Sequence, residues 1–453
     1  MDTLHNPTVK AVPDGTIANP FVLTTQTAPT DGLYHEVENQ PLRLPTDVVY
    51  IGVRGDGRVG SGASPADSID VPDAATYDAL IRSRAAIPTK WVYTSDVSSG
   101  GSQDADPNAF SNHWHDGQGH TLTLVGTPAV RVAFRNPSAE ASILDDFRVT
   151  RMKIDCDHAS NPAGRSAALN VSGCDLCLFE DVEVVNAGAA TVGELFVIAM
   201  QTVPNPTWCH IRHCKVHQMD HNGRVDGMTA ILLLRGYQLG TSSTEQYNRA
   251  NVSVYGCVVH GLFHPSGSGV LYSNGITSPL TDSCDFYDMV AGAYVEPKGN
   301  PGTIASEFRG MTVRNCTFRR FQVAVYCLYA GTVSNLKFTL DCYGNTFYTD
   351  EAPSAAGGLR VIDMIPPPAQ PALRTQAAII RNNRIGRSDG VQGAGVGQYA
   401  VMIRLVNVNQ ASIMDNVINQ FTAAVPVINS IDAATVTNLY KHNNRSIGGG
   451  VDF

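Results

Sequence analysis

The strongest constraint on the fold of this chain is a short repeated pattern. Each copy has an apolar residue, two mostly polar residues, then Cys or Asn (Val182 in the first copy), and then alternating apolar and polar residues. The copies begin at Asp175, Trp208, Asn251, Gly310, Thr339, Gln376 and Gln410. The recurring position holds Cys214, Cys257, Cys316, Asn345, Asn383 and Asn416. A second strand-like segment, such as AALNVS or VMIRLV, separates the copies, and the period is roughly 25 to 43 residues.

Short alternating strands at a drifting period, rich in Gly, Asn and β-branched residues, are typical of a solenoid. The units lack helical periodicity, which argues against helical repeats, and a β-propeller would need about four strands per blade. The Asn positions predict inward-facing ladders of side-chain amides. The pattern resembles the coils of the pectate-lyase-like superfamily from about Trp91 onwards. This resemblance implies an all-β fold, a single-stranded, right-handed parallel β-helix (solenoid) over residues 89–453.

Residues 1–88 lack the repeat and are predicted to form an N-terminal flanking and capping region. The segment Asp73–Ala85 predicts a helix. Such a helix would cover the open end of the first coil, where unpaired backbone groups invite aggregation. Gly55, Gly57 and Gly60 match G-x-G-x-x-G, but no helix is expected directly after them. The motif therefore predicts a tight hairpin rather than a dinucleotide site.

The 10 cysteines are predicted to be reduced residues of the core. Several lie inside strand-like patterns, and free cysteine is a small, strongly buried residue. Cys174 and Cys177 form a C-x-x-C pair, but no second pair follows to complete a zinc ribbon. A disulfide framework is not expected in a chain with 43% apolar residues, which can build a large core.

Charge and hydropathy limit the partners of the chain. The formal net charge of −9 gives no reason to expect nucleic acid, which needs a basic surface. No run of about eighteen apolar residues is present, so no membrane span is predicted. The N-terminus lacks a basic-then-apolar signal pattern. We expect a secreted protein whose signal segment is absent from this sequence, with a cytoplasmic protein as the alternative.

The stretch HCKVHQMDHNGRVDGM, residues 213–228, combines histidines, two aspartates and a cysteine. A metal site would need several of these side chains to converge on one ion. On a strand, His213 and His217 would lie about 13 Å apart, which is too far for a shared ion. No metal and no cofactor is therefore predicted, and His213 is placed in the bend before the inward-facing Cys214.

A β-helix offers a long groove of outward-facing residues that suits a polymer. Alternation sends Cys214 and Val216 inward and His217 outward. The same register predicts further outward residues on neighbouring coils: Lys153, Asp155, Glu183, His260 and Arg319. In the second strand set, the strand ends are predicted to align Gln201, Arg235, Asn274, Glu296, Asp363 and Arg404. This ladder would bind hydroxyls and carboxylates of a saccharide; the alternative is the ordinary polarity of a solvated sheet.

Two kinds of cleavage suit these residues, and the residues alone leave both open. Hydrolysis or transfer at a glycosidic bond needs two carboxyl groups. β-Elimination on a uronic polymer needs a base, here a histidine, and a cation such as Arg235 or Lys298. The predicted catalytic residues are Asp226, Glu296, Asp220 and His217. The predicted substrate-binding residues are Arg235, Asn274, His260, Lys298 and Gln201.

The catalytic signatures of the superfamily narrow the choice. The Gly-His-Gly of polygalacturonases and the Arg-x-Pro-x-x-Arg of pectate lyases are absent. The segment VDGMTAILL from Val225 is similar to the Asp-Gly-x-Thr strand entry of inulin fructotransferases. This resemblance implies that Asp226 is a catalytic carboxylate and that the chain forms a homotrimer. We predict an enzyme that cleaves a polysaccharide or oligosaccharide by lyase or intramolecular glycosyl-transfer chemistry. The alternatives are a glycoside hydrolase and a non-catalytic saccharide-binding spike or adhesin.

Overall fold

The computed structural model describes a stack of parallel strands. The chain divides into Met1–Leu44 and Pro45–Phe453, and every described residue belongs to the second unit. The structure describes residues 47–102, 106–136, 144–189, 195–202, 208–217, 228–234, 252–260, 267–273, 278–295, 298–299, 310–331, 335–348, 360–366, 371–386, 402–419 and 431–447.

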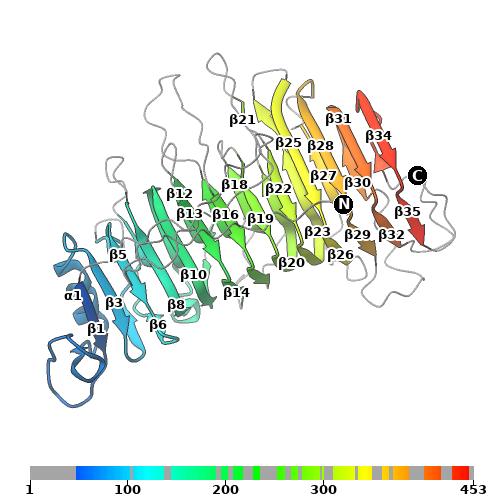
Figure 1. Cartoon of the computed structure of the whole chain (residues 1–453). Helices are drawn as coiled ribbons and strands as arrows, with labels where there is room; N and C mark the ends of the chain where they lie inside the picture. Colours follow the sequence, from blue (N-terminus) through cyan, green and yellow to red (C-terminus); the bar gives the residue numbers. More distant parts are fainter. Residues whose placement is uncertain are drawn as a thin grey trace, which may run out of the picture. The chain divides into compact units, whose positions relative to one another are not determined.

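The strands form three faces, and on each face a strand pairs in parallel with a strand of the next coil (Figure 1). The first face begins with β1 (Asp47–Gly52), which lies within the predicted flanking region but pairs in parallel with β3. The face continues with β3 (Thr89–Tyr93), β5 (His113–Asp116), β8 (Phe147–Asp155), β10 (Leu176–Val185), β13 (Trp208–Arg212), β16 (Val252–Tyr255), β19 (Leu280–Asp282), β22 (Met311–Arg314), β25 (Asn335–Tyr343), β28 (Arg374–Arg381), β31 (Val408–Met414) and β34 (Asn438–His442).

The second face contains shorter strands that follow the first face in each coil. The C-terminal halves of β8 and β10 belong to it, because they pair with β6 and β14. Its other strands are β4 (Val97–Ser99), β6 (Thr121–Leu124), β14 (Lys215–His217), β17 (Val258–His260), β20 (Asp285–Val295), β23 (Thr317–Leu328), β26 (Thr346–Tyr348), β29 (Arg384–Gly386), β32 (Val417–Asn419) and β35 (Arg445–Ile447).

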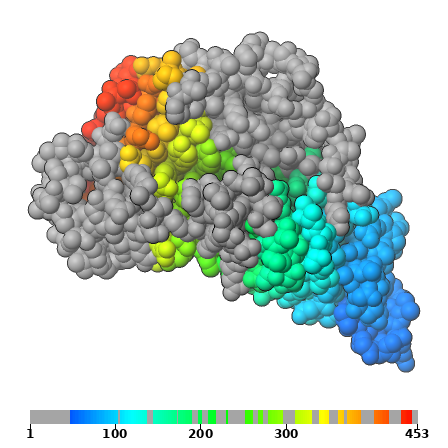
Figure 2. Space-filling view, turned by 180° about the vertical axis from the view of Figure 1, so that it is seen from behind, coloured from blue at the N-terminus to red at the C-terminus, as the bar shows by residue number. Residues whose placement is uncertain are grey.

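The third face closes each coil, and β20 and β23 run on into it from the second face. The space-filling view shows the described coils following one another in sequence order from blue to red (Figure 2). This arrangement confirms the predicted all-β parallel β-helix. The remaining third-face strands are β7 (Val130–Arg135), β9 (Arg165–Cys174), β12 (Leu195–Thr202), β15 (Met228–Leu234), β18 (Ser268–Ser273), β27 (Arg360–Ile365), β30 (Ile403–Leu405) and β33 (Ile431–Asp432).

A few short elements lie outside the three faces. β11 (Gly188–Ala189) pairs antiparallel with β9, and β21 (Lys298–Gly299) pairs with β24 (Ala330–Gly331) in a separate two-stranded sheet. The 3-10 helix η2 (His158–Ser160) lies between β8 and β9. These elements decorate the coils and do not interrupt the parallel pairing of the three faces.

The corner between the first and second faces has the same backbone form in many coils. A residue with positive φ comes first, for example His213 (50°), Gly256 (62°), Asn315 (54°) and Asn382 (55°). Gly and Asn are the residues that adopt this left-handed conformation at least strain. The buried Cys or Asn of the repeat follows directly. The predicted place of His213 in the bend is confirmed.

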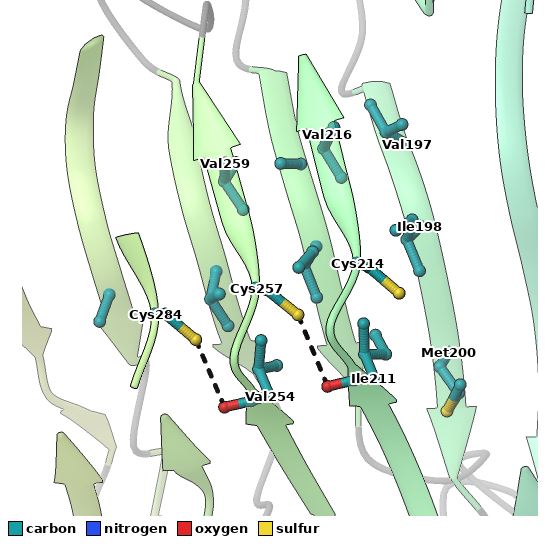
Figure 3. Close-up of a cluster of buried hydrophobic side chains, with 14 of the residues drawn as sticks. Val197, Ile198, Met200, Ile211, Cys214, Val216, Val254, Cys257, Val259 and Cys284 are labelled. Carbon is teal, nitrogen blue, oxygen red and sulfur yellow. Dashed lines mark hydrogen bonds between the residues drawn. The ribbon is translucent and has the colours of Figure 1, made fainter. Parts of the chain in front are cut away.

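The recurring position forms a ladder inside the core. Figure 3 shows Cys214, Cys257 and Cys284 on successive coils among buried Val and Ile side chains. The thiols of Cys257 and Cys284 point at the main-chain carbonyls of Ile211 and Val254. All ten cysteines are free and buried, which confirms the prediction of core thiols.

Later coils carry asparagine at this position, and the predicted amide ladder is confirmed. Asn345 Nδ2 donates to Asn383 Oδ1, and Asn383 Nδ2 donates to Asn416 Oδ1, both at 3.0 Å. Asn416 Nδ2 continues the series to Asn444 Oδ1 at 2.9 Å. Buried amides are stable only when bonded, so this chain of bonds fixes the register of these coils.

The predicted helix is confirmed as α1 (Ala74–Ser83). Asp73 caps its N-terminus, because the carboxylate accepts from the Thr76 N–H at 2.8 Å. Tyr77 and Ile81 are buried against the first coils. The Tyr77 hydroxyl lies 2.7 Å from that of Tyr93 on β3, which joins the helix to the stack. In the part of the chain that the structure describes, no helix is long and apolar enough to cross a membrane.

The prediction of a tight hairpin at the G-x-G-x-x-G motif is wrong. Gly55, Gly57 and Gly60 do have positive φ, as turn glycines should. However, β1 and the next strand, β2 (Ile69–Asp70), pair in parallel, whereas a hairpin joins antiparallel strands. The connection is a loop containing the 3-10 helix η1 (Pro65–Asp67). Arg54 closes this loop through hydrogen bonds to Asp56, Asp67 and the Ser68 carbonyl, at 2.8, 3.3 and 3.1 Å, respectively.

Candidate functional site

The outward surface of the second face carries the described candidate site. Apolar residues at the centre of each short strand point into the core and are buried: Val216, Val259, Phe286, Phe318 and Phe347. Because side chains alternate along a strand, the residues on either side of each face outward. Pairing places His260 opposite Tyr287, and Tyr287 opposite Arg319, on consecutive coils. The predicted outward orientation of His217, His260 and Arg319 fits their partial or full exposure.

His217 and His260, two predicted site residues, are neighbours in the structure. Their ring centroids are 5.1 Å apart. His217 Nε2 lies 2.7 Å from Glu183 Oε1 on the preceding coil, so a carboxylate holds this ring in place. His260 has Tyr287 on its other side, with ring centroids 6.5 Å apart in an edge-to-face arrangement. His260 is therefore the more available of the two imidazoles.

The environment of His260 favours the neutral imidazole. Partial burial is the largest cause of its lowered pKa, and repulsion from His217 lowers the pKa further. The carboxylates of Asp285 and Asp288 oppose this shift only in part. A neutral histidine accepts a proton, so at neutral pH His260 has the protonation state of a general base.

Asp285 has the opposite tendency. Partial burial raises the pKa of this carboxyl, and the positive charges of Arg319 and His260 only partly offset the rise. Its Oδ1 atom is buried and has no hydrogen-bond partner among the residues that the structure describes. A half-buried carboxyl with a raised pKa retains a proton more readily than an ordinary aspartate, which is what a general acid needs.

Arg319 completes the cluster. Its side chain is exposed, and its guanidinium lies 4.7 Å from the ring centre of Tyr348 on the next coil. The planar guanidinium can bind a carboxylate through two parallel hydrogen bonds. An imidazole, a carboxyl group and an exposed guanidinium thus lie on three consecutive coils.

Most of the other predicted site residues lie outside the described residues. These are Asp226, Asp220, Glu296, Arg235 and Asn274. The backbones of Gln201 and Lys298 lie in β12 and β21, but the structure does not describe their side chains. The roles predicted for these residues stay predictions.

The predicted third-face ladder is wrong in register at Gln201. This residue pairs with Leu234 and not with Arg235. The pairing of β12 with β15 keeps one constant offset from Leu195–Met228 to Gln201–Leu234, so the predicted alignment is off by one residue. Alternation along a strand indicates which residues face outward, but it does not determine which residues of two strands pair.

The alignment of Asp363 with Arg404 within the same ladder is confirmed. Asp363 pairs with Arg404 on the next coil, and two hydrogen bonds of 2.6 and 2.7 Å join their side chains. On its other side Asp363 pairs with Tyr326, which in turn pairs with Tyr294. The residue aligned with Asp363 two coils earlier is therefore Tyr294, and Glu296 lies outside the described residues.

Asp285 and Tyr287 were not predicted as site residues. The segment CDFYD, residues 284–288, repeats the order of CKVH at residues 214–217, so Asp285 takes the place of Lys215 and Tyr287 that of His217. This similarity is visible in the sequence, but the copies of the repeat identified from the sequence do not include the coil of residues 284–288. The partial burial that shifts the pKa of Asp285 has no signal in the sequence. Among the described residues no group of three His, Cys, Asp or Glu side chains is placed to hold a metal.

The strand pairing defines the chain as a parallel β-helix protein. Comparison of the chain with protein-family models and with curated proteins finds no match. The residues of the second face are therefore the basis for assigning a function.

Proposed function

We propose that the chain is a carbohydrate-active enzyme that cleaves an acidic polysaccharide by β-elimination on the second face. The observation that supports this most is the pair His260 and Asp285, whose pKa values are shifted in opposite directions next to the exposed Arg319. Both shifts favour the neutral forms of these neighbouring groups, and perturbed pKa values cluster at functional sites. Membership of the pectate-lyase-like superfamily and assembly as a homotrimer are part of the same proposal.

Each residue has one role in this reaction. Arg319 binds the carboxylate of a uronic sugar and stabilises the negative charge that develops when the adjacent C5 proton leaves. His260 accepts that proton through its neutral imidazole. The electron pair forms the C4–C5 double bond as the bond from C4 to the glycosidic oxygen breaks. Asp285 donates a proton to this leaving oxygen, so no water, metal or oxidant enters the balance.

Ultraviolet absorbance of the unsaturated product tests the proposal directly. We expect the chain to produce this absorbance with a uronate polymer and not with a neutral one. His260→Gln removes the base and should lower the rate by about a hundredfold or more. Arg58→Gln, an exposed arginine of the β1–β2 loop, is the control and should leave the rate unchanged. New reducing ends without the absorbance would instead indicate a glycoside hydrolase.

Intramolecular glycosyl transfer is the second candidate, and the start of β15 favours it. This strand begins at Met228, two residues after Asp226, as the Asp-Gly strand entry predicts. Transfer through Asp226 would make Asp226→Asn inactive and leave His260→Gln active, which is the reverse of the result expected for elimination. Binding of a polymer without cleavage by the native chain would favour the adhesin.

A further inference from the structure

From β23 to the last described coil, exposed arginines on the second face recur on every second coil. Arg319 lies on β23, Arg384 on β29 and Arg445 on β35. The strands between them, β26 and β32, present Thr346 and Val417 at the position where Arg384 and Arg445 stand. Coils in a parallel stack are about 4.8 Å apart, so successive arginines are separated by about 10 Å along the stack. Arg384 and Arg445 share one row with Thr346 and Val417, whereas Arg319 lies in the neighbouring outward row, that of Tyr348.

These three arginines differ from those on the other two faces. Arg319, Arg384 and Arg445 are exposed, and none of them forms an ion pair with another residue of the described part. By contrast, aspartates neutralise arginines elsewhere in the stack. These pairs are Arg314–Asp282 at 2.7 Å, Arg381–Asp341 at 3.4 Å and Arg404–Asp363 at 2.6 Å. Within the described ranges, Arg319, Arg384 and Arg445 are thus not neutralised by an aspartate, and they can bind an external anion.

The two-coil period continues into the proposed catalytic cluster. His260 on β17 precedes Arg319 by two strands, and Tyr287 on β20 lies between them. Tyr348 on β26 follows Arg319 in the same row. From β17 to β29, strands with a basic residue therefore alternate with strands that present a tyrosine hydroxyl, whereas β32 presents Val417. His217 falls outside this series because Glu183 already binds it.

We infer that the second face binds a polysaccharide in which a carboxylated sugar alternates with an uncharged one, with the polymer lying along the stack. Two coil spacings match one disaccharide unit of an extended chain, so each carboxylate would meet an arginine. A uronate homopolymer carries a charge on every sugar, and half of its carboxylates would face Tyr, Thr or Val. This inference rests on the proposed function for the choice of a polysaccharide as the anion.

Binding of the full chain to two polymers tests the period. The probes are hyaluronan, which alternates uronate with an uncharged sugar, and polygalacturonate, which is a uronate homopolymer. His260→Gln is used as the background so that cleavage does not obscure binding. We expect tighter binding of hyaluronan. Arg384→Gln and Arg445→Gln should each weaken it up to about fivefold, because an exposed ion pair contributes little. Arg58→Gln is the control.

A charge-preserving exchange gives the sharper test. Thr346→Arg combined with Arg384→Thr moves one charge by a single coil and keeps the total charge. The preference for hyaluronan should disappear in this double variant, while binding of polygalacturonate should be unchanged or tighter. An unchanged preference in the double variant would overturn the inference. Equal binding of both polymers by the His260→Gln chain, or binding of neither polymer, would also overturn it.

Binding and cleavage separate the two proposals. If the His260→Gln chain prefers hyaluronan but the native chain cleaves no polymer, the result would support the two-coil charge period and reject the proposed lyase activity. If the native chain cleaves polygalacturonate but the His260→Gln chain binds both polymers equally, the result would support the lyase activity and reject the two-coil charge period.

Discussion

The middle coils of the stack place cysteine at the inward corner, whereas the last coils place asparagine there. Cys214, Cys257, Cys284 and Cys316 form the cysteine ladder, and Asn345, Asn383, Asn416 and Asn444 form the asparagine ladder. Both ladders occupy the same position of the coil, directly after the residue with positive φ. The difference shows how two side chains solve one hydrogen-bonding problem.

Each corner leaves a buried N–H and a buried carbonyl that the next coil must satisfy. In the cysteine ladder, Cys316 Sγ accepts from the Cys284 N–H at 3.5 Å and points at the Thr281 carbonyl at 3.7 Å. In the asparagine ladder, Asn345 Oδ1 accepts from the Cys316 N–H and Asn345 Nδ2 donates to the Val313 carbonyl, both at 2.9 Å. The partners are equivalent, because Thr281 and Val313 each lie three residues before the ladder residue.

The two solutions differ in strength. A thiol is a weak donor and a weak acceptor, and it behaves mainly as a small apolar residue. An amide forms full hydrogen bonds and also bonds to the amide of the next coil. The asparagine ladder therefore gives stronger polar contacts between coils, but it leaves more buried polar groups unsatisfied if one member is lost.

Removal of an amide should have the largest effect. Asn383→Ala leaves the Asn345 N–H and the Cys342 carbonyl buried without their partners. We expect the free energy of unfolding to fall by about 3 kcal/mol or more. The matched change in the other ladder, Cys284→Ala, should lower it by about 1–2 kcal/mol, since a small cavity and weak contacts are lost. Denaturant unfolding of both variants measures the difference, and equal losses would contradict this account.

The parallel β-helix and its corner ladder could be predicted because they rest on repeated local choices. Alternation, inward Cys or Asn, and a turn residue such as His213 before them are all visible in the sequence. The prediction of a hairpin at Gly55–Gly60 is wrong because glycine indicates a turn but does not indicate the direction of the next strand. The predicted third-face ladder is wrong at Gln201 because alternation within each strand does not determine which residues of successive strands pair.

The candidate site was predictable only in part. His217 and His260 followed from alternation, and the structure brings their rings together. The shifted pKa of Asp285 depends on burial by residues from neighbouring coils, which no local pattern encodes. The two-coil period of Arg319, Arg384 and Arg445 requires the full register of the second face, because loops of unequal length separate these residues.

Alkaline pH should affect the two ladders differently. Burial raises the pKa of the Cys257, Cys284 and Cys316 thiols above the ordinary value of 9.0, whereas amides do not titrate. Above pH 9 the unfolded chain loses thiol protons that the folded chain retains, so stability falls as pH rises. Each such thiol adds a slope of about 1.4 kcal/mol per pH unit. Cys284→Ala should reduce the slope of unfolding free energy against pH by the contribution of one thiol. An unchanged slope would contradict the raised pKa of Cys284.

Exchange of one ladder residue for the other should have the smallest effect. Cys316 lies at the boundary, where its N–H already donates to Asn345 Oδ1. The amide introduced by Cys316→Asn would accept from the Cys284 N–H and donate to the Thr281 carbonyl, the two groups that the thiol now contacts. The gain in bond strength opposes the slightly larger volume, so we expect a change below about 1 kcal/mol. The reverse change, Asn345→Cys, breaks the bond to Asn383 and should be clearly destabilising. If Cys316→Asn proved as damaging as Asn383→Ala, the corners would not be equivalent, and the ladders would be two separate packing solutions.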